Sequence, residues 1–170
     1  MKVKPGSEAR VDYEFVRHGV VNVFIANEPL LGKRFTQIKE TKTKRDWARF
    51  IKLIADKYPK AEKISLVMDN LKTHVASALY ETFAPKDANR IWDRFEFIYT
   101  HGSWLNMAEI ELRILNGQCL NRHISTKKEV QVETIAWQNS RNRMKSSINW
   151  QFTTKDARIK LKRLYPSINV

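Results

Sequence analysis

The chain has 170 residues, of which 42% are hydrophobic and 11% aromatic, so it can close one hydrophobic core of ordinary domain size. Its 31 lysines and arginines exceed 18 acidic residues, and the resulting net charge of +13 indicates a polyanionic partner. One cysteine excludes an internal disulfide, and no apolar run approaches the roughly 20 residues of a membrane span. We expect a cytoplasmic, nucleoid-associated protein with no membrane partner.

The chain before residue 40 has strand patterns. Residues 20–26 form a β-branched and aromatic run, and residues 33–40 can return as a more polar strand. Apolar and acidic side chains also alternate over residues 11–16. We predict an antiparallel meander. In its first strand, Val11, Tyr13 and Phe15 should lie on one face, and Asp12 and Glu14 on the opposite face.

From Thr43 the apolar residues recur at helical spacing up to Pro59, which predicts a helix with Thr43 as its N-cap. Residues 64–68 follow as an uninterrupted apolar run, typical of a strand that is buried on both faces. A helix over about 74–83 should cover one of these faces.

The rest of the chain is predicted to be mostly helical. After a turn or two at 88–94 and a strand at 95–99, helices are expected from 103 to about 117, from 125 to about 142, and after Thr154. This order predicts an α/β domain with a mixed central sheet flanked by helices. From Leu112 onward, twelve basic and three acidic residues give a local net charge of +9.

Asp69 directly follows the predicted buried strand. Functional groups gather just outside such strand ends in open α/β sheets, and a buried acid needs a compensating charge such as a divalent metal. The alternative is that Asp69, with Asn70 and Thr73, caps the next helix. Both interpretations fit the local sequence.

Glu109 lies near the start of a later helix, with one predicted strand between it and Asp69. The two acids can therefore meet at one sheet edge and hold Mg²⁺ or Mn²⁺, which prefer carboxylate and water ligands. Glu109 could instead form a capping box with Asn106. Helical geometry does not choose between Glu109 and Glu111, which point about 200° apart, so one of them should face solvent.

Three long segments closely resemble bacterial insertion-sequence transposases related to the mariner elements, the insertion sequence six-thirty family. A further segment, Asp-Tyr-Glu-Phe-Val-Arg-His-Gly (12–19), looks like the part of the family that precedes its second strand. The resemblance covers nearly the whole chain. The three segments are Leu-Val-Met-Asp-Asn-Leu-Lys-Thr-His (66–74), His-Gly-Ser-Trp-Leu-Asn-Met-Ala-Glu-Ile-Glu (101–111) and Phe-Thr-Thr-Lys-Asp-Ala-Arg-Ile-Lys-Leu-Lys-Arg-Leu-Tyr-Pro (152–166).

This resemblance implies a ribonuclease H-like fold and a DDE-type nuclease and strand transferase. Such an enzyme uses two Mg²⁺ or Mn²⁺ ions to cut transposon ends and join them to target DNA. Asp69 would be the second catalytic and metal-binding carboxylate and Glu109 the third. Asn70 and His74 share the Asp69 motif and would orient the acid or pack the helix.

The chain departs from the family pattern at two places. No hydrophobic strand ending in an acid precedes Asp12, so we expect residues 1–170 to form a single truncated DDE endonuclease domain that lacks the first strand and its catalytic Asp. Asp12 and Glu14 are possible substitutes, but they match a different family segment. A Pro-Lys pair usual in the family is also absent between Thr100 and His101, which shortens the loop before Glu109.

The basic C-terminal helices, about 112–170, are the expected DNA-binding region because phosphate contact needs only accessible positive charge. Two function classes follow. The first is a transposase fragment that is inactive alone. The second is a non-catalytic DNA-binding module that regulates a full-length transposase, as a homo-oligomer or a mixed oligomer with it. The DNA-binding candidates are Lys155, Arg158, Lys160, Lys162 and Arg163.

Overall fold

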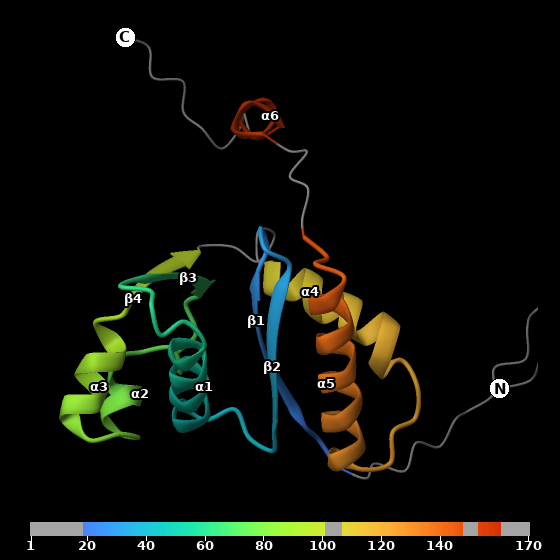
Figure 1. Cartoon of the computed structure of the whole chain (residues 1–170), viewed down its shortest axis with the longest axis horizontal. Helices are drawn as coiled ribbons and strands as arrows, with labels where there is room; N and C mark the ends of the chain where they lie inside the picture. Colours follow the sequence, from blue (N-terminus) through green and yellow to red (C-terminus); the bar gives the residue numbers. More distant parts are fainter. Residues whose placement is uncertain (1–18, 101–106, 148–152, 161–170) are drawn as a thin grey trace, which may run out of the picture.

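The computed structural model describes residues 19–100, 107–147 and 153–160 (Figure 1). The predicted strand at 11–16 and the shortened loop after Thr100 lie outside these ranges. Strands and helices follow one another in an α/β order. Their bounds are β1 Asn22–Glu28, β2 Lys33–Lys39, α1 Lys44–Lys57, β3 Ile64–Asp69, α2 Ser77–Tyr80, α3 Pro85–Trp92, β4 Phe95–Thr100, α4 Met107–Leu115, the π-helix η2 Asn116–Leu120, α5 Lys127–Arg143 and α6 Thr154–Lys160.

The strands form two sheets of two strands each. β1 and β2 pair antiparallel, from Asn22 opposite Lys39 to Glu28 opposite Lys33. β3 and β4 pair in parallel, from Ile64 opposite Phe95 to Asp69 opposite Thr100. The prediction combined both kinds of pairing in one central sheet. Among the described residues they are instead separate, because β1 and β3 are not hydrogen-bonded to each other.

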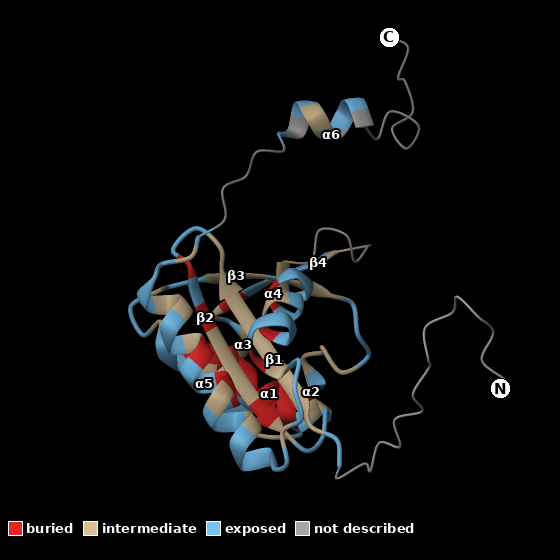
Figure 2. Cartoon of the chain, turned by 90° about the vertical axis from the view of Figure 1, so that its right-hand side faces the viewer, coloured by how far each residue is buried: buried red, intermediate tan, exposed pale blue. Residues whose placement is uncertain are grey.

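Helix α1 packs against residues of both sheets. Thr43 caps it as predicted, and its side chain and that of Asp46 form a reciprocal capping box. The buried side of α1, which includes Ile51 and Ile54, packs in one hydrophobic cluster with residues from both sheets. Figure 2 shows the buried residues gathered around this helix. The partly buried strand residues of the cluster include Phe24 and Ala26 from β1 and Leu66 and Met68 from β3.

Strand β3 is covered on one face only, so the prediction of burial on both faces is wrong. Leu66 and Met68 point into the core, whereas Val67 is 57% exposed and Ile98 on β4 is 44% exposed. An apolar run shows that a strand is hydrophobic, but it does not show how many helices are available to cover it. On the second face of the β3–β4 sheet, Ser65 and Val67 of β3 and Glu96 and Ile98 of β4 are all exposed.

The region between β3 and β4 is less helical than predicted. Helix α2 covers only Ser77–Tyr80, and Pro85 begins α3 instead of merely interrupting a helix. Proline suits the first helical position because its missing N–H has no helical partner there. Arg94 then anchors the entry to β4 by donating to the backbone carbonyls of Ala55, Tyr58 and Ala61 at the end of α1.

A second, smaller core lies on the other face of the β1–β2 sheet. Leu115, Cys119 and Trp137 pack there against Val23 and Ile25 of β1. Thr126 begins α5 with a second capping box, this time with Glu129. None of the described helices is long and apolar enough to cross a membrane.

The capping box of α1 makes a pH-dependent contribution to stability. Burial opposes ionisation of Asp46, but hydrogen bonds from Thr41 and Thr43 outweigh it, so the pKa of Asp46 lies below its ordinary value of 3.8. A carboxylate with a lowered folded-state pKa stabilises the fold above its unfolded pKa, and this contribution is lost as the pH falls through the folded value. We predict that Asp46→Ala lowers the free energy of unfolding at pH 7 by about 1–2 kcal/mol.

Urea denaturation between pH 7 and pH 3 tests this prediction. The difference between Asp46→Ala and the unmodified chain should shrink as the pH falls below about 4. Asp56→Ala is the matched control, because Asp56 lies on the exposed side of the same helix, where it forms a surface ion pair with Lys52. A pH-independent loss, or an equal loss in both variants, would contradict the capping role.

Candidate nuclease site

Asp69 ends β3 with its carboxylate accessible. The side chain is 47% exposed, and Nδ1 of His74 lies 3.1 Å from its Oδ1 and 3.2 Å from its backbone oxygen. The alternative that Asp69 caps the next helix is wrong. Helix α2 begins eight residues later, at Ser77, and its N-cap residue Ala76 makes no side-chain capping bond.

The two supporting residues of this motif differ in their surroundings. His74 is held in place, because its ring stacks on Trp47 at a centroid distance of 5.4 Å while Nδ1 faces Asp69. The ring therefore both packs on α1 and touches the acid, so orientation and packing are not exclusive roles. Asn70 is exposed. Only His74 has the contacts that a positioning residue needs.

Glu109 and Glu111 lie on opposite sides of α4, as the helical geometry predicted. Glu109, in the first turn, is exposed, whereas the side chain of Glu111 is 1% exposed. The possible capping partner Asn106 lies outside the described residues. Of the two acids, Glu109 is the one that a metal or a phosphate can reach.

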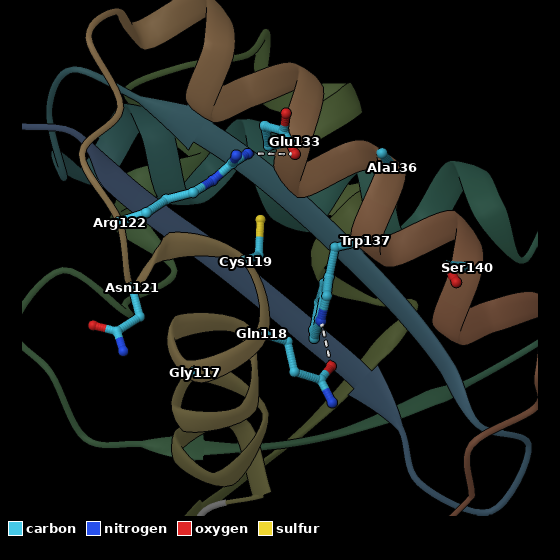
Figure 3. A pocket seen from close by; sticks show the side chains of 9 residues that line it. All are labelled: Gly117, Gln118, Cys119, Asn121, Arg122, Glu133, Ala136, Trp137 and Ser140. Carbon is cyan, nitrogen blue, oxygen red and sulfur yellow. Dashed lines mark hydrogen bonds and ion pairs between the residues drawn. The ribbon is translucent and has the colours of Figure 1, made fainter.

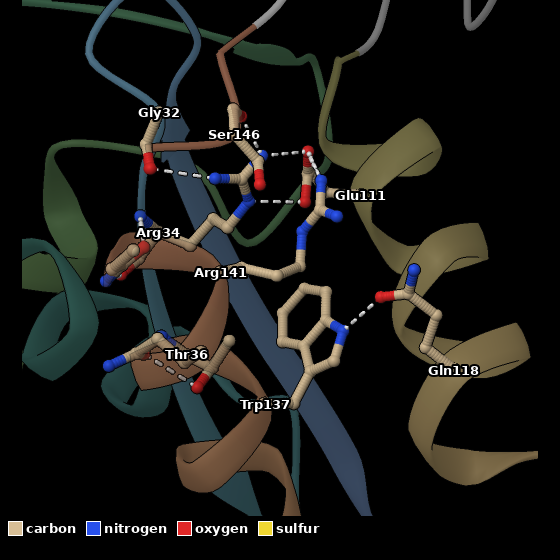
Figure 4. Close-up of polar contacts among 10 residues, drawn as sticks. Gly32, Arg34, Thr36, Glu111, Gln118, Trp137, Arg141 and Ser146 are labelled. Atoms are coloured by element: carbon tan, nitrogen blue, oxygen red, sulfur yellow. Dashed lines mark hydrogen bonds and ion pairs between the residues drawn. The ribbon is translucent and has the colours of Figure 1, made fainter. Parts of the chain in front are cut away.

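Glu111 is occupied by a buried arginine. Nε of Arg34 on β2 donates to Oε2 of Glu111 at 2.6 Å, and Nη2 donates to Oε1 at 2.7 Å (Figure 4). Arg141 of α5 approaches Oε1 at 3.4 Å. Nη1 of Arg34 also donates to the backbone oxygen of Gly32 at 2.8 Å, and Nη2 to that of Ser146 at 2.6 Å. Both oxygens of Glu111 are thus engaged, and this acid is structural.

The backbone of Arg34 is held as well. Asn142 of α5 accepts from its N–H at 2.8 Å and donates to its carbonyl at 2.9 Å. Beside it, Gly32 has a φ of +64°, and a Cβ there would lie 2.6 Å from the backbone carbon of Lys145. The turn between β1 and β2 therefore packs directly against the end of α5. We name this arrangement of Gly32, Arg34, Glu111, Arg141 and Asn142 the arginine junction.

The sequence analysis missed the arginine junction, although one signal for it was present. In a strand over 33–40, residues 34, 36 and 38 share a face, and Ile38 marks that face as the buried one. An arginine on a buried face needs a carboxylate partner. That partner lies 77 residues away on α4, where no local pattern identifies it.

The carboxylates of Asp69 and Glu109 are suitable ligands for a divalent metal, but two carboxylates alone do not make a complete metal site. Carboxylate oxygens are the ligands that Mg²⁺ and Mn²⁺ prefer. Within ranges 19–100, 107–147 and 153–160, however, no three acidic, histidine or cysteine side chains gather closely enough to hold a metal. Asp69 ends β3, and Glu109 lies in the first turn of α4, which packs against β1. The segment 101–106 that leads to α4 is not described.

The predicted DNA-binding residues are only partly described. Lys155 and Arg158 are exposed on α6. Lys160 ends this helix, and Lys162 and Arg163 lie outside the described residues. Further exposed basic side chains lie on α5 and just after it. They are Lys127, Lys128, Arg143 and Lys145.

An open pocket of about 440 Å³ lies between η2 and α5, away from both candidate acids (Figure 3). Trp137 forms one wall and donates from Nε1 to Gln118 at 2.9 Å, and Arg122 pairs with Glu133 at 2.9 Å. Burial raises the pKa of the Cys119 thiol inside it, and Glu133 adds to the effect. None of the residues predicted for catalysis or DNA binding lines this pocket.

A family model described as DDE superfamily endonuclease matches residues 2–131, which include Asp69, His74, Glu109 and Glu111. The match covers most of the chain, and the chain belongs to this superfamily of DNA endonucleases, whose members generally use divalent metals. The α/β arrangement is compatible with that assignment. Neither the curated proteins nor the solved structures contain a significant match.

We predict that breaking the buried Arg34–Glu111 pair lowers the free energy of unfolding far more than breaking the exposed Arg90–Asp87 pair. Arg34→Met should lower the free energy of unfolding by about 3–5 kcal/mol, because it leaves the Glu111 carboxylate buried with only the more distant Arg141. Arg90→Met should cost less than about 1 kcal/mol, because the Arg90–Asp87 pair is exposed. Chemical denaturation monitored by tryptophan fluorescence compares the two. Similar small losses in both would show that the buried pair is not essential to the fold.

Proposed function

We propose that this chain carries two carboxylates, Asp69 and Glu109, of a metal-dependent DNA-cleaving site of the transposase type. The observation that carries the proposal is the different engagement of the acids. Glu111 is locked in the arginine junction, whereas the exposed Glu109 and the half-exposed Asp69 stay available. Mg²⁺ or Mn²⁺ bound by carboxylates would supply the positive charge that polarises a phosphodiester.

The site is incomplete as far as the described residues show. The insertion sequence six-thirty resemblance calls for three catalytic acids, and no third acid joins Asp69 and Glu109 in the described ranges. Groups that act as a unit lose most of their rate when one is removed. We therefore propose that the chain alone cleaves DNA feebly, and that His74 positions the Asp69 carboxylate.

Plasmid nicking with Mg²⁺ or Mn²⁺ tests the catalytic proposal. We expect slow, metal-dependent nicking that is lost in Asp69→Ala and Glu109→Ala and kept in Glu81→Ala, which removes an exposed acid on another helix end. Nicking that survives both substitutions would reject these two residues. Fast turnover that Asp12→Ala abolishes would instead show that the first acid lies within residues 1–18.

A second candidate function is favoured by the charge of the C-terminal third. Its net charge of +9, carried in part by exposed side chains on α5 and α6, suits a non-catalytic module that binds DNA through phosphates. Such a module would act at the nucleoid by occupying DNA. It could also join a full-length transposase in a mixed oligomer. No base-reading motif is present in the sequence, so its specificity should be weak.

Salt dependence of DNA binding tests this surface. The affinity should fall steeply between 50 and 200 mM salt, because each phosphate contact releases counterions. The double variant Lys155→Ala/Arg158→Ala should reduce the slope of log affinity against log salt by about 2. Lys86→Ala/Arg90→Ala, which removes two exposed charges from α3, should leave it unchanged. Absence of binding at low salt would reject the DNA-binding assignment.

A further inference from the structure

Two adjacent leucines lie at the tip of the β1–β2 hairpin. The turn between the strands, residues 29–32, reads Pro-Leu-Leu-Gly, and Leu30 and Leu31 are 74% and 54% exposed. Turns usually carry small or polar residues, so the turn itself does not require two leucines. Met144, the C-cap residue of α5, is a third apolar residue at 64% exposure. Apolar side chains that gather on a surface in this way mark an interaction site.

The hairpin turn and the end of α5 hold each other in place. A Cβ at Gly32 would lie only 2.6 Å from the backbone carbon of Lys145. Leu31 and Met144 directly precede these two residues. The Arg34 guanidinium donates to a backbone oxygen on each side of this contact. The exposed apolar residues therefore stand on a fixed support, and a surface that is already ordered loses less conformational entropy when it binds.

The rim of this apolar group is basic. The segments 29–33 and 143–147 contain three basic residues and no acidic residue. Glu28, which pairs with Lys33 in the hairpin, accepts a hydrogen bond from the Tyr58 hydroxyl at 2.7 Å. The exposed basic residues of the rim are Lys33, Arg143 and Lys145. We name the surface formed by Leu30, Leu31, Lys33, Arg143, Met144 and Lys145 the hairpin tip.

The hairpin tip lies at the end of the domain where α4 begins (Figure 1). Glu111, in the first half of α4, binds Arg34 next to the turn. Leu115, at the end of α4, packs instead with Val23 near the start of β1. The first turn of α4 is therefore on the side of the hairpin tip, and Glu109 precedes Glu111 by about 3 Å along the helix axis. A ligand bound at the tip would lie at the same end of the domain as this candidate metal-binding acid.

We propose that the hairpin tip binds duplex DNA and bends it, with the basic rim on the backbone phosphates and Leu30 and Leu31 against the bases. Phosphate contact needs accessible positive charge, which the rim supplies. Leucine and methionine are among the apolar side chains that proteins insert between base steps in the minor groove, which kinks the duplex. The proposal rests on the DNA-binding function proposed above, and adds a deformation of the bound duplex that phosphate contacts alone would not produce.

The charge of the surface favours DNA over the other possible occupants. A second copy of the chain carries the same net charge of +13 and the same basic rim, so two tips would repel each other. An anionic membrane surface would also attract the rim. The position of the tip at the Glu109 end of the domain favours DNA over a membrane, because that acid belongs to the proposed DNA-cleaving site.

Energy transfer between dyes at the two ends of a short DNA duplex measures bending by the full chain at saturating protein. We expect the unmodified chain to raise the transfer efficiency. Leu30→Ser/Leu31→Ser should abolish this rise and weaken binding about tenfold, because two apolar side chains lose their contact with the bases. Val132→Ser/Ile135→Ser is the matched control, since both residues are exposed in the middle of α5. The control should bend the duplex as the unmodified chain does.

The salt dependence of DNA binding tests the basic rim separately. A variant with alanine at all three basic residues of the hairpin tip should reduce the slope of log affinity against log salt by about 3. Leu30→Ser/Leu31→Ser should keep the slope, because it removes no charge. The control variant with alanine at three exposed basic residues elsewhere should leave bending unchanged. These control positions are Lys60, Lys86 and Arg90.

Several outcomes would overturn the proposal. Bending that persists in Leu30→Ser/Leu31→Ser, or DNA binding by the unmodified chain without bending, would reject the apolar contact while leaving the proposed DNA binding intact. An unchanged salt slope in the triple alanine variant would reject the basic rim. Both tip variants retain Asp69 and Glu109, so metal-dependent nicking reports on the catalytic proposal independently. Absence of DNA binding at low salt would overturn the hairpin-tip proposal together with the DNA-binding function.

The same variants identify a different occupant. If DNA binding and bending are unchanged and Leu30→Ser/Leu31→Ser loses self-association in sedimentation, the tip contacts a second copy and the proposal is overturned. Loss of binding to vesicles of anionic phospholipid, again with unchanged DNA bending, would assign the tip to a membrane surface and overturn it as well. The substituted positions are all exposed, and equal thermal unfolding of variants and unmodified chain checks that the fold is retained.

Discussion

The fold depends on one buried ion pair, between Arg34 of β2 and Glu111 of α4. Removing two charges from water costs several kcal/mol per ion, and this cost is offset only where the geometry is good and every donor finds an acceptor. Four of the five N–H donors of Arg34 find acceptors in Glu111 and the backbone oxygens of Gly32 and Ser146. A single side chain thereby fixes the first hairpin, α4 and the end of α5 relative to one another.

This constraint also decides which acid of α4 is available for chemistry. Two residues along a helix correspond to about 200°, so a carboxylate held inward at Glu111 turns Glu109 outward. Asp69 is accessible for a different reason, because it is the last residue of β3. His74, which stacks on Trp47, contacts its carboxylate from one side. The candidate site thus rests on two separate supports: the arginine junction behind Glu109 and the core above α1 behind Asp69.

Local features of the structure could be predicted from the sequence, whereas features that depend on distant partners could not. Helix α1 was predicted with Thr43 as its N-cap because the helical period and the cap lie within one segment, and the structure adds the reciprocal bond from Asp46. The α4 helix was predicted as well, but the choice between Glu109 and Glu111 needed Arg34, 77 residues away. Burial of β3 on both faces was wrong for a related reason, since Val67 is apolar but its side chain is 57% exposed.

The position of Arg34 in the chain has a consequence for synthesis on the ribosome. Its contact with Ser146 spans 112 residues, and at 5–20 residues per second the arginine is translated roughly 6–22 s before that partner. During the first 77 residues of this interval the charge lacks its carboxylate Glu111, and until the end it lacks the Ser146 carbonyl, which disfavours burying the face of the hairpin that carries it. The nascent hairpin should therefore remain incompletely packed until α5 has emerged, so that final closure of the domain comes late in translation.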